Sequence, residues 1–231
     1  MIQISNLSKK YGETVVFSDL NYTFENACIY GLVGRNGAGK TTLLNILSNY
    51  DKNYTGVISI DRKKMNKVDY LDMPVAYAMD QPSFFNELTI YENLLLIASS
   101  RKIKKQEAFD KIERILDGLG LKKYENYSPL ELSKGTMQRL NNACAMRQEE
   151  KITIFDEPFS GLDPVQMKLL ENVIVEFHKK EKGIYIISSH DIECLQNVCD
   201  KCLLLHNGQI REINMEEVDR EEIAKILSEG E

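Results

Sequence analysis

The chain has 231 residues, of which 43% are hydrophobic and 28% are charged, a composition typical of a globular protein with a substantial core. The formal net charge of −6 argues against a nucleic-acid partner, because no overall basic field would attract a polyanion. The opening residues lack the apolar segment of a signal peptide, and no apolar run is long enough to cross a bilayer. We therefore expect a cytoplasmic protein, or one bound peripherally to the inner face of the cell membrane.

The first half of the chain is predicted to change from strands to helices. Short strands with turns are expected over residues 2–12, 14–24 and 28–34. A glycine-rich loop follows, and residues 41–47 then have the apolar spacing of a helix, before a second β-rich stretch at about residues 56–79. From about residue 88 to residue 146 the pattern is helical. Its clearest part has one apolar face, formed by Ala108, Phe109, Ile112, Ile115, Leu116 and Leu119.

Strands and helices alternate again in the second half. Strands are predicted over residues 152–155, 184–188 and 202–206, and helices between them over residues 168–177 and 191–198. This alternation is typical of a parallel sheet with crossover helices. The sequence therefore predicts an α/β core that is interrupted by a helical insert.

Three of the five cysteines, Cys194, Cys199 and Cys202, have the spacing C-x4-C-x2-C. A metal or cluster site is one interpretation of this spacing. No histidine or second cysteine pair completes the spacing of a zinc site, however, so we favour reduced thiols. Two of these thiols are expected on a helix and one at the beginning of a strand.

A phosphate-binding motif lies between a predicted strand and a predicted helix. The residues GRNGAGKT match G-x-x-x-x-G-K-[ST] in full. Glycines allow the backbone to form a nest of N–H groups around phosphate oxygens, and the helix N-terminus adds partial positive charge. Lys40 is expected to reach the β- and γ-phosphates, and the Thr41 hydroxyl is a candidate Mg²⁺ ligand. The candidate nucleotide-binding residues are Gly34, Arg35, Asn36, Gly37, Ala38, Gly39, Lys40, Thr41 and Thr42.

The nucleotide is expected to be ATP. Residues 66–69, NKVD, imitate the guanine-recognition motif of GTPases, but they follow the phosphate loop too closely. The DxxG sequence at residues 117–120 comes after them, which is the reverse of the GTPase order. We therefore take both matches as coincidental.

Two adjacent acidic residues follow the apolar strand ITIF. In a sheet of this kind, the C-terminal tip of a buried strand lies beside the phosphate loop. Asp156 is then placed to hold Mg²⁺, and Glu157 to orient or deprotonate an attacking water. The presence of Glu157 favours hydrolysis over binding alone.

Taken in order, these motifs resemble the nucleotide-binding subunit of ATP-binding cassette (ABC) transporters over nearly the whole chain. The resemblance implies a single domain over residues 1–231, with a P-loop NTPase (RecA-like) α/β core, an antiparallel β subdomain and an inserted α-helical subdomain at about residues 82–146. A charged, amphipathic C-terminal helix is expected at about residues 215–228. Tyr11 matches the aromatic residue that stacks on adenine, and SGLD, which ends at Asp163, matches the D-loop. His190 matches the switch histidine that contacts the γ-phosphate.

The segment LSKGTMQRL resembles the family signature, usually written LSGGQ. In the family, this segment begins a helix that faces the ATP held by a second subunit. Ser133 and the N–H groups near Gly135 would then donate to that γ-phosphate, and Ser133 also suits a helix N-cap. Lys134 replaces a glycine, as in the branch linked to antibiotic and drug export. Thr136 replaces the glutamine, a less usual change that bears on ATP-driven dimerisation.

The family's Q-loop glutamine is also displaced. Counting back from the LT sequence at residues 88–89, Asp80 occupies its position and Gln81 is the neighbour. Either residue could contact Mg²⁺ or the attacking water. In the family, this loop couples the ATP site to the membrane partner.

The resemblance implies an ATPase that uses ATP and Mg²⁺ and works with a separate transmembrane permease subunit. Two copies, or this chain and a paralogous ATPase, would form an ATP-dependent head-to-tail dimer. The direction of transport is expected to be export, from Lys134 alone. A non-transport ABC ATPase, for example in cluster assembly, and a regulatory module with low turnover remain open. A small-molecule kinase would share the phosphate loop but would not explain Ser133, Asp163 and His190 in series.

Overall fold

The computed structural model describes residues 1–65, 68, 73–100, 105–146 and 150–214. Its N-terminal part forms a four-stranded antiparallel sheet in the order β2-β1-β4-β5. Buried side chains recur mainly at alternate positions of the first strand, because one face of the sheet packs on the core. The strands are β1 (Ile2–Tyr11), β2 (Thr14–Phe24), β4 (Thr55–Ile60) and β5 (Lys63–Lys64).

A second sheet has six strands in the order β10-β9-β3-β8-β7-β6. All its neighbouring strands are parallel except β9 and β10. Strands β3, β7 and β8 are buried at every residue, because other layers cover both faces of the sheet. The strands are β3 (Cys28–Val33), β6 (Val75–Ala78), β7 (Ile152–Phe155), β8 (Ile184–Ser189), β9 (Lys201–His206) and β10 (Gln209–Ile213).

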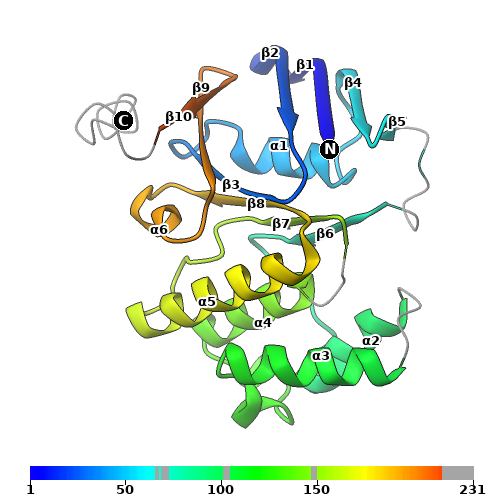
Figure 1. The fold of residues 1–231 in the computed structure, drawn as a ribbon, viewed down its shortest axis with the longest axis vertical. Coiled ribbons are helices and arrows are strands. Elements are labelled where there is room, and N and C mark those ends of the chain that lie inside the picture. The colour runs from blue at the N-terminus through cyan, green and yellow to red at the C-terminus, as the bar shows by residue number, and fades with distance from the viewer. Residues whose placement is uncertain (66–67, 69–72, 101–104, 147–149, 215–231) are drawn as a thin grey trace.

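The helices complete a layered arrangement (Figure 1). Helix α1 (Lys40–Leu47) lies between the two sheets, and its Leu43 and Leu44 share one core with residues of both. Helices α4 (Lys134–Met146) and α5 (Pro164–Glu181) cover the other face of the parallel sheet. Beyond them lie α2 (Ile90–Ser100) and α3 (Lys105–Gly118), and the short 3₁₀ helices η3 (Lys122–Tyr124) and η4 (Pro129–Glu131) lead from α3 to α4.

The apolar face predicted in the helical insert packs on a second core. Ile112, Ile115 and Leu116 of α3 are fully buried there with Leu140 of α4 and Ile174 of α5. The described structure thus contains the predicted α/β core, the antiparallel sheet and the helical insert.

One strand was missed and one local prediction needs correction. Strand β10 was not predicted, although the Asn207-Gly208 pair before it signals a hairpin, with φ of 48° and 71°. Helix α6 (Glu193–Gln196) ends before Cys199, so only Cys194 of the three clustered cysteines lies on a helix. All five cysteines are free thiols, and the described residues contain no cluster of three or more metal-binding side chains.

Two segments singled out in the sequence fall outside this description. The predicted C-terminal helix at residues 215–228 lies beyond the described residues, as does most of the NKVD sequence. Within the described part of the chain, no helix has both the length and the apolar composition that a membrane span requires.

Candidate nucleotide-binding site

The phosphate loop joins the end of β3 to the start of α1 and forms one wall of a cavity of about 550 Å³. Gly39 has a φ of 101°, and a Cβ there would lie 2.7 Å from a methyl group of Val16, so only glycine fits. The cavity is lined by Tyr11, Thr14, Val16, Arg35, Asn36, Gly37, Gly39, Lys40, Thr41, Thr42, Asp80, Glu157, Ser160 and His190. Gly34 and Ala38 belong to the loop but do not line the cavity.

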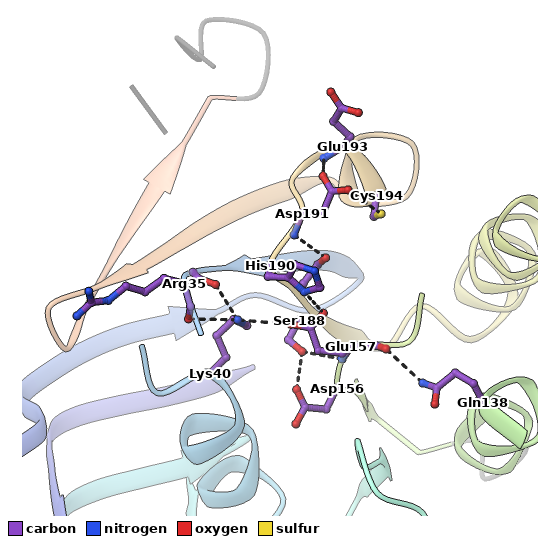
Figure 2. A network of polar contacts seen from close by, with 12 residues as sticks. Arg35, Lys40, Gln138, Asp156, Glu157, Ser188, His190, Asp191, Glu193 and Cys194 are labelled. Atoms are coloured by element: carbon purple, nitrogen blue, oxygen red, sulfur yellow. Dashed lines mark hydrogen bonds and ion pairs between the residues drawn. The ribbon is translucent and has the colours of Figure 1, made fainter. Parts of the chain in front are cut away.

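Lys40, the first residue of α1, is 6% exposed and reaches back across its own loop. Its Nζ donates to the Gly34 carbonyl at 2.7 Å and lies 3.4 Å from Oε1 of Glu157. Figure 2 shows this ammonium group between the loop carbonyls and the carboxylate. A cation held in this way suits binding of anionic phosphates.

Asp156, directly after β7, is almost fully buried. Ser188 Oγ donates to its Oδ1 at 2.6 Å, and the Tyr77 hydroxyl donates to its Oδ2 at 3.4 Å. Burial is the main cause that raises the pKa of Asp156, and hydrogen bonds from Ser188 and Thr41 oppose it. A cation beside this carboxylate would therefore relieve a costly buried charge.

Glu157 lies between Lys40 and His190, which also line the cavity. Its Oε2 is 3.0 Å from Nδ1 of His190, while its Oε1 faces Lys40 (Figure 2). Its backbone has a φ of 48°, and its N–H donates to Ser188 Oγ at 2.9 Å. A residue with a strained backbone conformation that several surrounding contacts stabilise is typical of a functional site. Ser188 therefore orients both acidic residues, a role that the sequence analysis missed although the residue stands two positions before His190.

Tyr11 ends β1 at the rim of the cavity, with 53% of its surface exposed. Its hydroxyl donates to Oδ2 of Asp51 at 3.1 Å, and the Lys9 ammonium lies 4.4 Å from the ring centroid. Lys9 also pairs with Asp51 at 2.7 Å. The three residues form a cluster that holds the ring at the rim, and nothing in the local sequence pattern pointed to Lys9 or Asp51.

Replacing Asp51 with asparagine is expected to destabilise the fold. Burial opposes ionisation of Asp51, but hydrogen bonds from Lys9, the Asn53 N–H and Tyr11 lower its pKa. The wild-type advantage, ~1–3 kcal/mol, should therefore be complete above about pH 5 and decline as the pH falls below about 4, toward the lowered pKa of the folded protein. Urea unfolding between pH 3 and pH 7 measures this, with Asp117→Asn on exposed α3 surface as control. A pH-independent difference would contradict the prediction.

Of the two Q-loop candidates, Asp80 lines the cavity and Gln81 does not. Both side chains are exposed, in the segment that follows β6. Of these two residues, Asp80 is therefore the one that the structure places at the cavity wall.

The signature residues lie apart from this cavity. Ser133 precedes α4, and its Oγ accepts from the Thr136 N–H at 3.3 Å, which makes it the N-cap of that helix. Gly135 packs on the D-loop, since a Cβ there would lie 3.1 Å from the Gly161 carbonyl. Asp163 caps α5 by accepting from the Gln166 N–H at 2.8 Å. None of the three predicted residues, Ser133, Gly135 and Asp163, lines the cavity of its own chain.

Three buried amide side chains connect α4 to the loops that follow β6 and β7. Gln138 donates to the Glu157 carbonyl at 3.2 Å, Asn141 to the Met79 carbonyl at 2.6 Å, and Asn142 to the Pro158 carbonyl at 3.1 Å. These carbonyls lie beside Asp80 and in the loop of Glu157. The helix that begins at Ser133 is thereby fixed to both segments, a connection that sequence analysis did not predict.

A phosphate loop between β3 and α1, with two carboxylates at the end of β7, defines the fold as an α/β P-loop NTPase. The sequence model of the family described as ABC transporter matches residues 17–160. The chain belongs to this family, as one of its ATP-binding subunits, and is an ATPase of the ATP-binding cassette class. The fold class predicted from the sequence is confirmed.

Relatives with different named roles are similar to the chain to the same degree. It is 30% identical to the bacitracin transport ATP-binding protein BcrA of Enterococcus faecalis, over 95% of this chain and 71% of that protein. It is also 30% identical to the tungstate uptake system ATP-binding protein TupC of Peptoclostridium acidaminophilum, over 91% of this chain and 97% of that protein. A solved structure of an ATP binding subunit of an ABC transporter has a TM-score of 0.85 and 26% identity, covering 99% of this chain and 95% of that one.

Proposed function

We propose that this chain hydrolyses ATP at the inner face of the cell membrane to power export through a separate transmembrane permease subunit. One observation carries the proposal: Lys40, Glu157 and His190 converge on one cavity, with the buried carboxylate of Asp156 beside it. This arrangement can bind a triphosphate and activate a water, which a binding module alone does not need.

ATP would lie along the cavity with its adenine against Tyr11 and its phosphates over the loop between β3 and α1. The backbone N–H groups of that loop and the N-terminus of α1 would hold the phosphate oxygens. Lys40 would exchange its bond to the Gly34 carbonyl for the β- and γ-phosphates.

The residues present fit Mg²⁺. Thr41 and Asp156 supply hard oxygen atoms that are already hydrogen bonded to each other, and Asp80 adds a carboxylate at the wall of the cavity. Mg²⁺ would neutralise phosphate charge and fix the orientation of the phosphates. The desolvated charge of Asp156 is the feature of this chain that favours a cation.

Glu157 would orient the attacking water and accept its proton. Its two carboxylate oxygens face Lys40 and His190, so its direction is fixed before the nucleotide arrives. His190, whose side chain is 58% exposed, is free to turn toward the γ-phosphate. Loss of that phosphate after hydrolysis would remove the contacts of Lys40 and His190 together.

The position of Ser133 supports a head-to-tail dimer, formed with a second copy or with a paralogous ATPase. Ser133 does not line the cavity of its own chain, yet it begins a helix whose N–H groups suit an anion. In the dimer, Ser133 and the N–H near Gly135 would face the γ-phosphate that the partner holds, with Asp163 nearby in the D-loop. ATP would favour the closed dimer by binding it more tightly than the open form.

Export is supported by Lys134 in the signature segment and by the similarity to BcrA, which is named as a bacitracin transport protein. The similarity to TupC, named as part of a tungstate uptake system, supports transport more broadly than it supports a direction. The direction can be tested by reconstituting the chain with a permease in vesicles. Movement of a radiolabelled or fluorescent substrate across the vesicle membrane is then measured with the substrate added on either side.

Light scattering of the Glu157→Gln variant with and without Mg-ATP tests the dimer, because slow hydrolysis leaves ATP bound. We expect an ATP-dependent dimer, and we expect Glu157→Gln combined with Ser133→Arg to stay monomeric while it still binds ATP. A dimer that survives Ser133→Arg would contradict the proposed role of the signature segment. ATP binding without turnover by the wild type would instead favour a regulatory module.

A further inference from the structure

We propose that Thr136 is a positioning residue: held by Arg139, it directs the Ser133 hydroxyl hydrogen outward to a phosphate on a second copy of the chain. The inference rests on the proposed head-to-tail dimer and extends it. It assigns a role to the residue that departs most from the signature pattern, since Thr136 stands where the family usually has glutamine.

Thr136 lies in the first turn of α4 and is 3% exposed. Its Oγ1 is 2.9 Å from Oγ of Ser133, so the two hydroxyl groups share one hydrogen bond. Nη2 of Arg139 donates to the same Oγ1 at 3.2 Å. Arg139 is itself buried, at 5% exposed, and its Nη1 donates to the Leu119 carbonyl at 2.6 Å and to the Gly120 carbonyl at 3.2 Å.

Either hydroxyl group could donate in the shared hydrogen bond, and we assign the donor role to Thr136. A guanidinium group only donates, so Arg139 occupies a lone pair of Thr136 Oγ1. Ser133 Oγ already accepts from the Thr136 N–H at 3.3 Å. When the Thr136 hydroxyl donates to the second lone pair of Ser133, the acceptor capacity of Ser133 is filled and its own hydrogen is left to point outward.

This orientation is the one that a phosphate requires. Phosphate oxygens at neutral pH mainly accept hydrogen bonds, so Ser133 contributes only when it donates. In the opposite orientation, Ser133 would spend its hydrogen on Thr136 and present lone pairs to an anion. Arg139 also places positive charge behind the two hydroxyl groups, which strengthens Ser133 as a donor.

The test measures dimerisation and ATP binding separately, in the Glu157→Gln background. We expect Thr136→Val, which keeps the shape but removes the hydroxyl, to raise the dimer dissociation constant in Mg-ATP by about tenfold or more, the effect of one hydrogen bond to a charged group. Thr136→Ser should restore dimerisation to within about threefold of the parent, as the hydroxyl is kept. ATP affinity of the monomer should change little, because Thr136 does not line the cavity of its own chain.

Further variants separate the proposed role from a loss of folding. Thr136→Ala lacks the hydroxyl without adding bulk, and Thr153→Val removes a buried threonine hydroxyl from β7 as a matched control. If Thr136 acts through Ser133, the change Thr136→Val should add little to Ser133→Ala. Thermal unfolding and monomer ATP affinity report whether each variant is folded.

The outcomes are distinct. Normal dimerisation of both Thr136→Val and Thr136→Ala would overturn the role of Thr136 and leave the dimer proposal intact. Equal weakening by Thr136→Ser and Thr136→Val would also overturn it, because shape rather than the hydroxyl would then matter. If the Glu157→Gln parent itself does not dimerise with ATP, the proposed dimer fails, and the role of Thr136 with it.

Discussion

Changing Glu157 to glutamine is expected to lower the rate of ATP hydrolysis by about 10²–10⁴-fold, the contribution of a general base. The carboxylate is oriented by His190 at 3.0 Å and by Lys40 at 3.4 Å, so its loss removes a proton acceptor that is already in position. An amide of the same shape preserves the contacts of the cavity wall, so ATP affinity should fall little. Single-turnover phosphate release and equilibrium binding of labelled ATP measure the two effects separately.

Glu193→Gln is the matched control for Glu157→Gln. Glu193 begins α6 on the exposed surface, and Figure 2 shows it pointing away from Glu157 and Lys40. The control loses the same charge and should hydrolyse ATP at the wild-type rate. If Glu157→Gln hydrolyses ATP within about threefold of the wild-type rate, the loss of rate is much smaller than removal of a general base would cause. Another residue would then be the general base.

Changing Lys40 to methionine is expected to weaken ATP binding by at least about a hundredfold, equivalent to the ~3 kcal/mol of a hydrogen bond to a charged group. Lys40 is the cation that the fold buries against the phosphate loop, where low solvent access strengthens its attraction to phosphate. The substitution also removes the contact of the Glu157 carboxylate with Lys40 and keeps its contact with His190. Isothermal titration with ATP and thermal unfolding without nucleotide distinguish lost affinity from lost stability.

Lys63→Met, on the exposed strand β5, controls for loss of a lysine charge. It should bind ATP with wild-type affinity. Retention of tight ATP binding by Lys40→Met would contradict the assignment of the cavity. Increased thermal stability with lost affinity would still agree with it, since a buried charge carries a desolvation cost.

The class of fold and the residue types at the site could be predicted from local patterns along the chain. Strands β3, β7 and β8 could be predicted because each is a short apolar run, and such runs belong to parallel strands buried on both faces. The phosphate loop could be predicted because its chemistry is local: glycines, a lysine and a hydroxyl act within one turn of backbone. Asp156 and Glu157 could be placed beside it because parallel strands end at the same edge of a sheet.

The residues that support that site could be identified only from the folded protein. Ser188 meets Asp156 across 32 positions of sequence, Lys9 meets Asp51 across 42 positions, and Asn141 meets the Met79 carbonyl across 62 positions. Each of these residues looks like an ordinary polar residue in its local segment, because its partner is brought near only when the sheets and helices pack. The same packing placed Asp80, and not Gln81, at the cavity and kept Ser133 out of it. The spacing of apolar residues specifies which face of a helix or strand is buried. Contacts between polar groups far apart in the sequence depend instead on how the helices and sheets pack together.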